Sequence, residues 1–462
     1  MPLDPVPALL ARATERLERH FASLPPLAAS TGNFAATPGP GSAPAAQAAL
    51  EEVLEAVATR LADNYPYFHP LYAGQMLKPP HPVARAAYAL AMAINPNNHA
   101  RDGGRASSEM EIEAVRHIAQ LFGWTECLGH LTSSGTLANL EALWVAGLSA
   151  PGKRILASAQ AHYTHNRISA VLKLPFTPIP ADDRGRMDLN ALEDELRRGD
   201  VGAVVVTLGT TAMGAVDPLH QVLALRQRYG FRIHVDAAYG GYFRLISAAL
   251  DEPARLAYAA LHQADSIVVD PHKHGLQPYG CGCILFRDPS VGRFYKHDSP
   301  YTYFTSHQLH LGEISLECSR AGASAVALWA THQLLPLLPH GEFARGLGQG
   351  RAATLDLDLR LRLDARFEPL RAGPPELDIV VWKLAAPTPR QAAALAQSVF
   401  AACAARDLHL ALVELPLTWF QAGAGAGTVT CLRSVLMKPE HQAWLGQIWD
   451  KLSAATTEVL RG

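Results

Sequence analysis

The stretch VVDPHKHGLQPYGCGCILF, residues 268–286, places one lysine between two histidines among apolar and small residues. A lysine is costly to bury and rarely lies in such surroundings without a partner. Three interpretations of Lys273 follow from this. In the first, Lys273 is a covalent anchor for a cofactor. In the second, it neighbours a metal site built from His272 and His274, and in the third it is an ordinary surface charge after a strand.

Length and composition narrow the class of protein. The chain has 462 residues, which predicts roughly two to three domains. Its composition, 49% hydrophobic and 18% charged with a formal charge of −2, gives no sign of a nucleic-acid or anionic-membrane partner. We find no apolar run near the ~20 residues of a spanning helix, no secretory signal pattern and no disulfide framework among six cysteines. These features predict a soluble, cytoplasmic protein with reduced thiols.

Three segments differ in their pattern along the chain. Residues 1–105 contain two expected helices, at about 7–22 and 50–64, and then an arm rich in proline, tyrosine and asparagine, in which we expect little regular structure. Residues 106–345 alternate helices with buried apolar strands such as VGAVVVTLG, which predicts βαβ units and a mainly parallel sheet. Residues 346–462 predict a smaller C-terminal α/β domain with a mixed sheet.

Four short stretches lie at expected strand ends, where open α/β sheets bind their ligands. In HLTSSGTLANLEAL (130–143), Ser134, Gly135 and Thr136 begin a helix, either as a simple cap or as a cradle for phosphate. In HVDAAYGG (234–241), three roles are open for Asp236: it caps a loop, it binds a metal, or it pairs with a protonated ring nitrogen. In SAQAHYTHNRIS (158–169), His162 is structural or stacks on a flat ring.

The fourth stretch is the lysine segment, and together the four favour a cofactor anchor. A lysine that forms a Schiff base needs partial desolvation, so that its amine is nucleophilic. Pyridoxal phosphate requires a phosphate cradle, an acidic partner for its ring nitrogen and such a lysine. The metal interpretation is weaker, because His272 and His274 point to opposite faces of an extended segment and the CGC pair lacks the usual spacer of zinc sites.

Several motifs then resemble one family. DPHKH (270–274), HVDAAYGG, TLGTTAMGAVDP (207–218) and SLECSRAGASAVALW (315–329) resemble the signatures of group II pyridoxal-phosphate-dependent amino-acid decarboxylases, in that family's order and spacing. The family includes glutamate, aromatic-amino-acid, histidine and diaminobutyrate decarboxylases. The resemblance implies a type I PLP-dependent transferase fold, similar to that of aspartate aminotransferase, and an enzyme that converts an L-amino acid to an amine and CO2. The chain departs from many relatives in having His274, rather than tryptophan, after the lysine.

The resemblance also implies roles for individual residues. Lys273 would hold the cofactor as an internal aldimine, Asp236 would pair with the pyridinium nitrogen, and His162 and Ala238 would lie against the two ring faces. Arg433 matches an arginine that helps to bind the substrate carboxylate, with a strand-edge ion pair as the alternative. The other implied cofactor-binding residues are Ser134, Gly135, Thr136, Thr210, Asp270 and His272.

Two more segments are expected to reach the substrate. Family members are generally homodimers with shared active sites, so the arm would line the partner's pocket with His69, Tyr72 and Gln75, although core packing explains Tyr72 equally well. A loop beyond the lysine contains Tyr301 and Tyr303, either of which would protonate the α-carbon after CO2 leaves. The resemblance thus implies a small-molecule amino-acid substrate and a homodimer.

Other activities stay open on the sequence. If Phe304 stood at the proton donor's position, oxygen-dependent conversion to an aldehyde would become possible. AGQML (73–77) and AINPNNHARDGG (93–104) are similar to stretches of sphingosine-phosphate-lyase-type proteins, which cleave a carbon–carbon bond and would need a further basic phosphate site. SLECSR and LRSVLM favour the decarboxylase, and retention of Lys273, Asp236 and His162 argues against a non-catalytic protein. An acidic substrate would need a second cation beyond Arg433, and an aromatic one an apolar slot.

Overall fold

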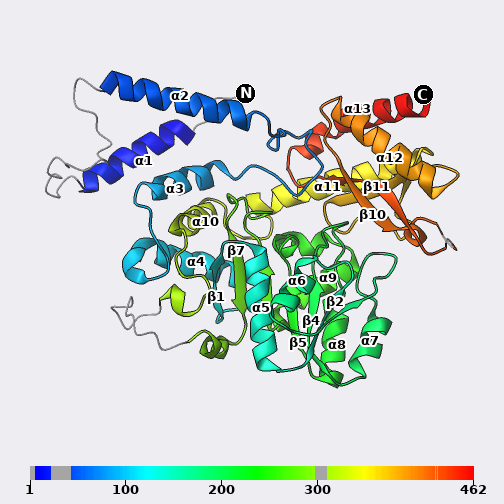
Figure 1. The fold of residues 1–462 in the computed structure, drawn as a ribbon, viewed down its shortest axis with the longest axis horizontal. Coiled ribbons are helices and arrows are strands. Elements are labelled where there is room, and N and C mark those ends of the chain that lie inside the picture. Colours follow the sequence, from blue (N-terminus) through cyan, green and yellow to red (C-terminus); the bar gives the residue numbers. More distant parts are fainter. Residues whose placement is uncertain (1–5, 22–42, 297–309, 422, 424, 462) are drawn as a thin grey trace.

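A computed structural model describes residues 6–21, 43–296, 310–421, 423 and 425–461. The chain forms a large domain on a seven-stranded sheet and a smaller C-terminal domain on a four-stranded sheet. Helices of the N-terminal segment lie along the upper side of this body (Figure 1). The α/β organisation predicted from alternating helices and strands is confirmed.

The large sheet has the strand order β1-β7-β6-β5-β4-β2-β3. It is mainly parallel, as predicted, but β7 runs antiparallel to both β1 and β6. Every residue of β4 is buried, as expected for a parallel strand that is covered on both faces. The strands are β1 (Leu128–Thr132), β2 (Arg154–Ser158), β3 (Phe176–Ile179), β4 (Val201–Thr207), β5 (Arg232–Asp236), β6 (Ser266–Val269) and β7 (Gly282–Phe286).

Helices connect and cover these strands. One of them, α5, packs on the middle of the sheet against β4, β5, β6 and β7, so its first turn reaches the strand ends (Figure 1). Many of its residues are buried, because the helix packs both on the sheet and against α6. The helices of this domain are α4 (Arg105–Leu121), α5 (Gly135–Ser149), α6 (Thr164–Val171), α7 (Leu189–Leu196), α8 (Leu219–Tyr229), α9 (Glu252–Ala259) and α10 (Gly322–Leu334).

The C-terminal sheet has the order β10-β11-β9-β8, and each neighbouring pair is antiparallel. The expectation of a mixed sheet is therefore wrong. The helix α12 does join β9 to β10 as a βαβ pattern requires, but β11 inserts between these two strands and pairs with both. The elements are β8 (Phe367–Pro369), β9 (Ile379–Leu384), β10 (Ala411–Pro416), β11 (Thr428–Val435), α11 (Glu342–Leu363), α12 (Pro389–Ala404) and α13 (His441–Arg461).

The N-terminal segment contains α1 (Val6–Phe21), α2 (Ala43–Leu61) and α3 (Pro82–Met92). The third helix lies in the arm, where the sequence predicted little regular structure. It begins because His81 caps it by accepting the N–H of Val83 and because Pro82 occupies its first position. The arm also contributes Leu71 and Ala73 to the core of the C-terminal domain.

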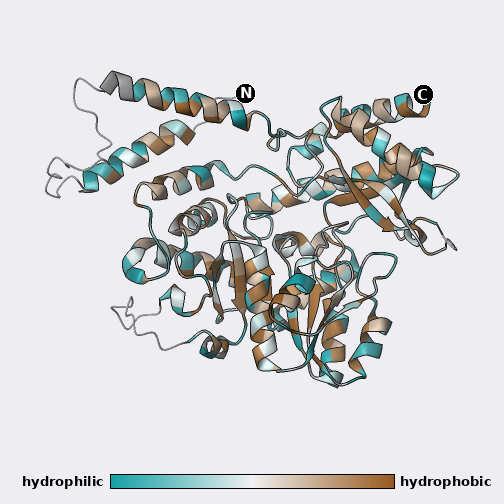
Figure 2. Ribbon diagram, viewed as in Figure 1, coloured by the Kyte–Doolittle hydropathy of each residue, from teal (hydrophilic) through white to brown (hydrophobic). Residues whose placement is uncertain are grey.

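Helices α1 and α3 pack on one another, and α3 packs on α10. Helix α2 instead projects at the edge of the molecule, with apolar residues along its length (Figures 1 and 2). Leu50, Val53, Leu54 and Val57 are 46–58% exposed. Within the described segments, no helix is both long enough and apolar enough to cross a membrane.

Candidate active site

Most of the predicted cofactor-binding residues meet at the carboxyl ends of the strands of the large sheet, the edge at which such sheets bind ligands. Asp236 ends β5, Asp270 directly follows β6, and His162 follows β2 by four residues. Strand β1 leads into the first turn of α5. One pocket at this edge is lined by Ser134, Gly135, Thr136, His162, Asp236, Ala238, Asp270, His272 and Lys273.

The first turn of α5 offers unpaired N–H groups and hydroxyls to this pocket. Ser134 caps the helix, because its Oγ accepts the N–H of Leu137 at 3.3 Å. Gly135 lies so close to Asp270 that a Cβ there would stand 2.4 Å from Oδ2 of the carboxylate. Only glycine therefore fits at this position. A helix start with free N–H groups and the hydroxyl of Thr136 suits a phosphate.

Asp236 is buried at the floor of the pocket and accepts hydrogen bonds from three groups. Its Oδ2 lies 2.8 Å from Nε2 of His165 and 3.5 Å from Nδ2 of Asn139. Its Oδ1 accepts the N–H of Ala238 at 3.1 Å. Burial by itself raises the pKa of this carboxyl, but the hydrogen bond from His165 and the nearby ammonium of Lys273 hold the pKa well below its usual range. The group is therefore an anion able to pair with a protonated ring nitrogen.

A chain of polar groups fixes the Asn139 amide that faces Asp236. Burial lowers the pKa of His234 to about 3, so its imidazole is neutral. Its Nε2 lies 2.8 Å from Oδ1 of Asn139, which can only accept, so this nitrogen carries the proton. Its Nδ1 then accepts from the hydroxyl of Ser266 at 2.9 Å. The amide of Asn139 is thereby turned with its N–H groups toward the carboxylate.

Lys273 provides the amine of the pocket. Its Nζ lies 3.0 Å from Oδ2 of Asp270, and its side chain is 23% exposed. The other carboxylate oxygen of Asp270 has no hydrogen-bond partner among the described residues. His272 donates from Nδ1 to the carbonyl of Cys281 at 2.8 Å, and burial lowers its pKa. A neutral His272 thus faces the pocket beside the lysine.

The histidines on either side of Lys273 face different surroundings. His274 points away from the pocket, where its Nε2 lies 3.2 Å from Oδ2 of Asp378 in the C-terminal domain. The same carboxylate accepts the hydroxyl of Tyr239, a residue that lines the pocket. In the part of the chain that the structure describes, no three histidine, cysteine or acidic side chains gather as a metal site would require. His274 instead joins the lysine segment to the C-terminal domain.

Comparison with known proteins identifies the family. The model described as "Pyridoxal-dependent decarboxylase conserved domain" matches residues 39–335, more than half of the chain. The chain belongs to this family. Its cofactor is pyridoxal 5′-phosphate. The pocket suits this group chemically, with an anion-binding helix start, an ionised carboxylate surrounded by donors, and an amine beside a carboxylate oxygen that lacks a partner.

Sequence identity between this chain and individual relatives is low. An L-tyrosine decarboxylase of Enterococcus faecium is 28% identical, over 67% of this chain and 66% of that protein. A probable L-tyrosine/L-aspartate decarboxylase of Methanothermobacter thermautotrophicus is 31% identical, over 56% of this chain and 69% of that protein. The structure of Oryza sativa TDC with PLP and tryptamine superposes with a TM-score of 0.77 at 19% identity, over 99% of both chains. The chain spans 62–66% of the length of the tyrosine decarboxylases that it matches.

Two residues implied by the family pattern do not line the pocket of this family member. Thr210 is fully buried, and its Oγ1 accepts the N–H of Ala215 at 3.0 Å. Its neighbour Thr211 lines the pocket instead. Arg433 lies on β11 and is 4% exposed. Thr210 therefore shapes the turn that presents Thr211.

The guanidinium of Arg433 binds four oxygens of neutral groups. It donates to the carbonyls of Gly74 at 3.0 Å, Thr211 at 2.7 Å and Ala212 at 2.9 Å, and to Oε1 of Gln75 at 3.2 Å. Arg433 thereby joins the arm, the loop after β4 and the C-terminal sheet. These contacts support a structural role and include no ion pair within the described residues, and binding of a substrate carboxylate by Arg433 stays a prediction.

The arm residues His69, Tyr72 and Gln75 do not line the pocket of their own chain. Tyr72 is 5% exposed and packs among other rings of the arm, so core packing explains it. The predicted proton donors, Tyr301 and Tyr303, lie outside the described residues. The roles of these residues in a partner's pocket or in the loop stay predictions.

Sequence reasoning missed several residues that the fold brings to the site. His165 and Asn139 hold Asp236, and Tyr239 and Thr211 line the pocket. One of these had a signal, because Asn139 follows Thr136 by three positions, a spacing that places side chains on one side of a helix. Further lining residues are Thr164, Thr207 and Gly209.

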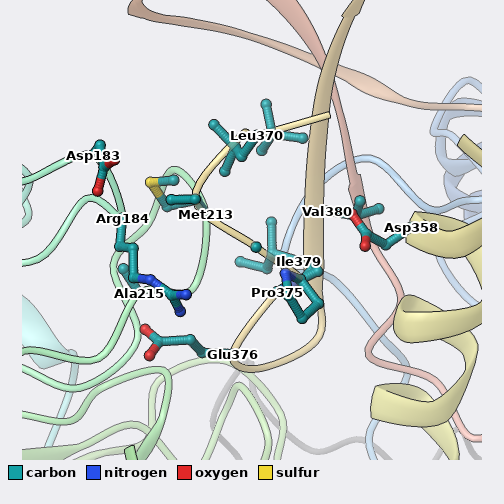
Figure 3. Close-up of a pocket in the computed structure, with 14 residues that line it drawn as sticks. Asp183, Arg184, Met213, Ala215, Asp358, Leu370, Pro375, Glu376, Ile379 and Val380 are labelled. Atoms are coloured by element: carbon teal, nitrogen blue, oxygen red, sulfur yellow. The ribbon is translucent and has the colours of Figure 1, made fainter. Parts of the chain in front are cut away.

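A second pocket lies between the large and C-terminal domains and contains none of the predicted site residues (Figure 3). Arg184 and Glu376 extend toward one another at one side of it, and Met213 and Ile379 provide apolar walls (Figure 3). Glu376 accepts the N–H of Val216 at 2.7 Å and forms an ion pair with a buried arginine, Arg186. The polar groups of this second pocket therefore stabilise the contact between the two domains.

Proposed function

We propose that this protein removes CO2 from an L-amino acid and releases the corresponding amine. The observation that carries this proposal is the meeting of Lys273, Asp236 and His162 at one pocket, from three separate strand ends. Pyridoxal phosphate, when bound, supplies an electron sink that stabilises the negative charge left at the α-carbon as its carboxylate departs. The protein contributes binding, orientation and electrostatics.

Each residue of the pocket has a part in this proposal. Lys273 is the covalent attachment point, Asp236 holds a proton at the ring nitrogen, and His162 and Ala238 flank the ring. Burial lowers the pKa of His162, so a neutral imidazole is available to stack on the ring. Ser134, Gly135, Thr136 and His272 hold the phosphate, and Asp270 positions the lysine amine through its 3.0 Å contact.

We propose an aromatic, uncharged side chain for the substrate. None of the described residues that line the pocket is an arginine, and Arg433 already donates to four oxygens of the protein. A second carboxylate would thus lack the bidentate partner that acidic substrates favour. Relatives named as tyrosine decarboxylases support the same choice, whereas the names of others include L-aspartate, so the test must contain both substrates.

The test is a panel of L-amino acids added to the cofactor-loaded protein, with CO2 and organic products both measured. The panel contains tyrosine, phenylalanine, tryptophan, glutamate and aspartate. We expect CO2 with an equal amount of an aromatic amine, abolished in Lys273→Ala and kept in Lys153→Ala, which removes an exposed lysine. An aldehyde in place of the amine would favour an aldehyde synthase. Cleavage only of a phosphorylated long-chain substrate would favour a carbon–carbon lyase, and CO2 from aspartate or glutamate alone would refute the aromatic assignment.

We also propose that the protein is a homodimer and that a second copy covers α2. Four large apolar side chains of this helix, Leu50, Val53, Leu54 and Val57, are about half exposed. Burying such a side chain fully contributes about 1.5–3 kcal/mol. A patch of this kind on a projecting helix is typical of an interface. The arm that follows α2 would then approach the pocket of the other copy, as expected for His69 and Gln75.

A further inference from the structure

His165 is the closest side chain to Asp236. Its Nε2 lies 2.8 Å from Oδ2 of the carboxylate, and the two side chains are 1% and 5% exposed. A hydrogen bond to a charged group in such a dry site contributes more than one in water. The contact therefore fixes both the position and the charge of Asp236.

The surroundings of His165 decide which nitrogen carries its proton. Its Nδ1 is buried and has no hydrogen-bond partner among the described residues. A proton on Nδ1 would thus be a buried donor without an acceptor, which costs about 1–3 kcal/mol. The proton belongs on Nε2, where it points at Asp236. His165 therefore donates to the carboxylate through Nε2.

The amide of Asn139 and the main-chain N–H of Ala238 also favour the ionised form of Asp236. The chain Ser266–His234–Asn139 ends with the amide N–H of Asn139 on Oδ2 of Asp236. The remaining oxygen accepts the main-chain N–H of Ala238. Both oxygens of the carboxylate thus face donors. A proton on either oxygen would be directed against an N–H group, so the neutral acid is disfavoured.

We propose that His165 and Asn139 are positioning residues that keep the shared proton on the ring nitrogen of the cofactor and not on Asp236. The titratable groups that face Asp236 are His165 and His162 from the segment after β2, His234 on β5, and Lys273 from the loop after β6. Of these groups, His165 is the one whose ring nitrogen is in direct hydrogen-bond contact with the carboxylate. The proposal depends on the cofactor and not on the identity of the substrate.

The first test locates the shared proton with pyridoxal phosphate labelled with 15N in its ring, bound to the protein and observed by NMR. We expect the ring nitrogen to be protonated in the wild type. In His165→Phe the equilibrium should move toward a protonated Asp236 by about tenfold, the lower limit for a hydrogen bond to a charged group. His165→Gln keeps a donor and should restore most of the effect. The control His332→Phe removes a buried histidine elsewhere, whose ring nitrogens have no hydrogen-bond partner among the described residues, and it should change nothing.

The second test uses the protein without cofactor. Infrared difference spectra between a protein and its Asp236→Asn variant report the pH at which Asp236 takes up a proton. This pH should rise by about one unit or more in His165→Phe, because one pKa unit is about 1.4 kcal/mol. If His165→Phe does not fold, NMR of the imidazole nitrogens in the wild type shows which nitrogen of His165 carries the proton. A proton on Nδ1 of His165, or an unshifted ring nitrogen in a folded His165→Phe, would overturn the proposal.

Discussion

Replacing Arg433 by methionine should separate the arm from the rest of the protein. The side chain is 4% exposed and donates four hydrogen bonds to the arm and to the loop after β4. Methionine fills a similar volume but leaves three main-chain carbonyls, those of Gly74, Thr211 and Ala212, buried without that donor. Each such loss costs about 1 kcal/mol or more, so we expect the free energy of unfolding to fall by about 3–5 kcal/mol.

The measurement is urea unfolding of the cofactor-loaded protein, followed by tryptophan fluorescence and circular dichroism. With a slope of roughly 3 kcal/mol per molar, the midpoint should fall by about 1–1.7 M. Arg390→Met removes an exposed arginine of the same domain and should stay within about 0.5 kcal/mol of the wild type. Arg433→Lys should recover little, because an ammonium cannot reproduce the fork of a guanidinium.

If Arg433 binds the substrate carboxylate instead, the same substitution should change KM and not the stability. If its guanidinium chiefly binds the substrate carboxylate, Arg433→Met should raise KM strongly while the unfolding midpoint stays with that of Arg390→Met. This outcome would refute the structural role that we derive from its contacts. Chymotrypsin cleavage after Tyr72, in the arm, gives an independent reading, since a released arm should be cut faster in Arg433→Met.

Three further outcomes follow from the structure. Gly135→Ala should weaken cofactor binding at least about tenfold with little loss of fold, because the new Cβ would stand 2.4 Å from Asp270, as equilibrium dialysis can measure. Burial raises the pKa of Asp378, but His274 and a tyrosine hydroxyl lower it overall, so this carboxylate stabilises the fold above about pH 4. The destabilisation caused by Asp378→Asn should therefore be largest near neutral pH and shrink as the pH falls below about 4, in urea midpoints taken across that range. Leu54→Glu should shift the protein from dimer to monomer in light scattering, and an unchanged mass would argue against α2 as the interface.

A carboxylate of the C-terminal domain, that of Asp378, contacts two residues of the site region. Asp378 lies next to β9 and contacts Tyr239, in the wall of the pocket, and His274, beside the attachment lysine. His274 therefore has a physical reason in this chain, which the lysine segment read by itself did not provide.

Local patterns in the sequence determined the α/β organisation and most of the pocket. Buried apolar runs and helical spacing are properties of short segments, and the polar groups that follow successive parallel strands must meet at one edge of the sheet. For this reason Lys273, Asp236, His162 and the first turn of α5 could be assigned to one site without any coordinates.

Only the tertiary structure decided the partners of those residues. His165 meets Asp236 across 71 positions, and Arg433 meets Gly74 across 359. The insertion of β11 between β9 and β10, which made the smaller sheet antiparallel, is likewise a matter of pairing between distant segments. Such contacts depend on how whole elements pack, and no short-range pattern of the chain records which buried donor will face which acceptor.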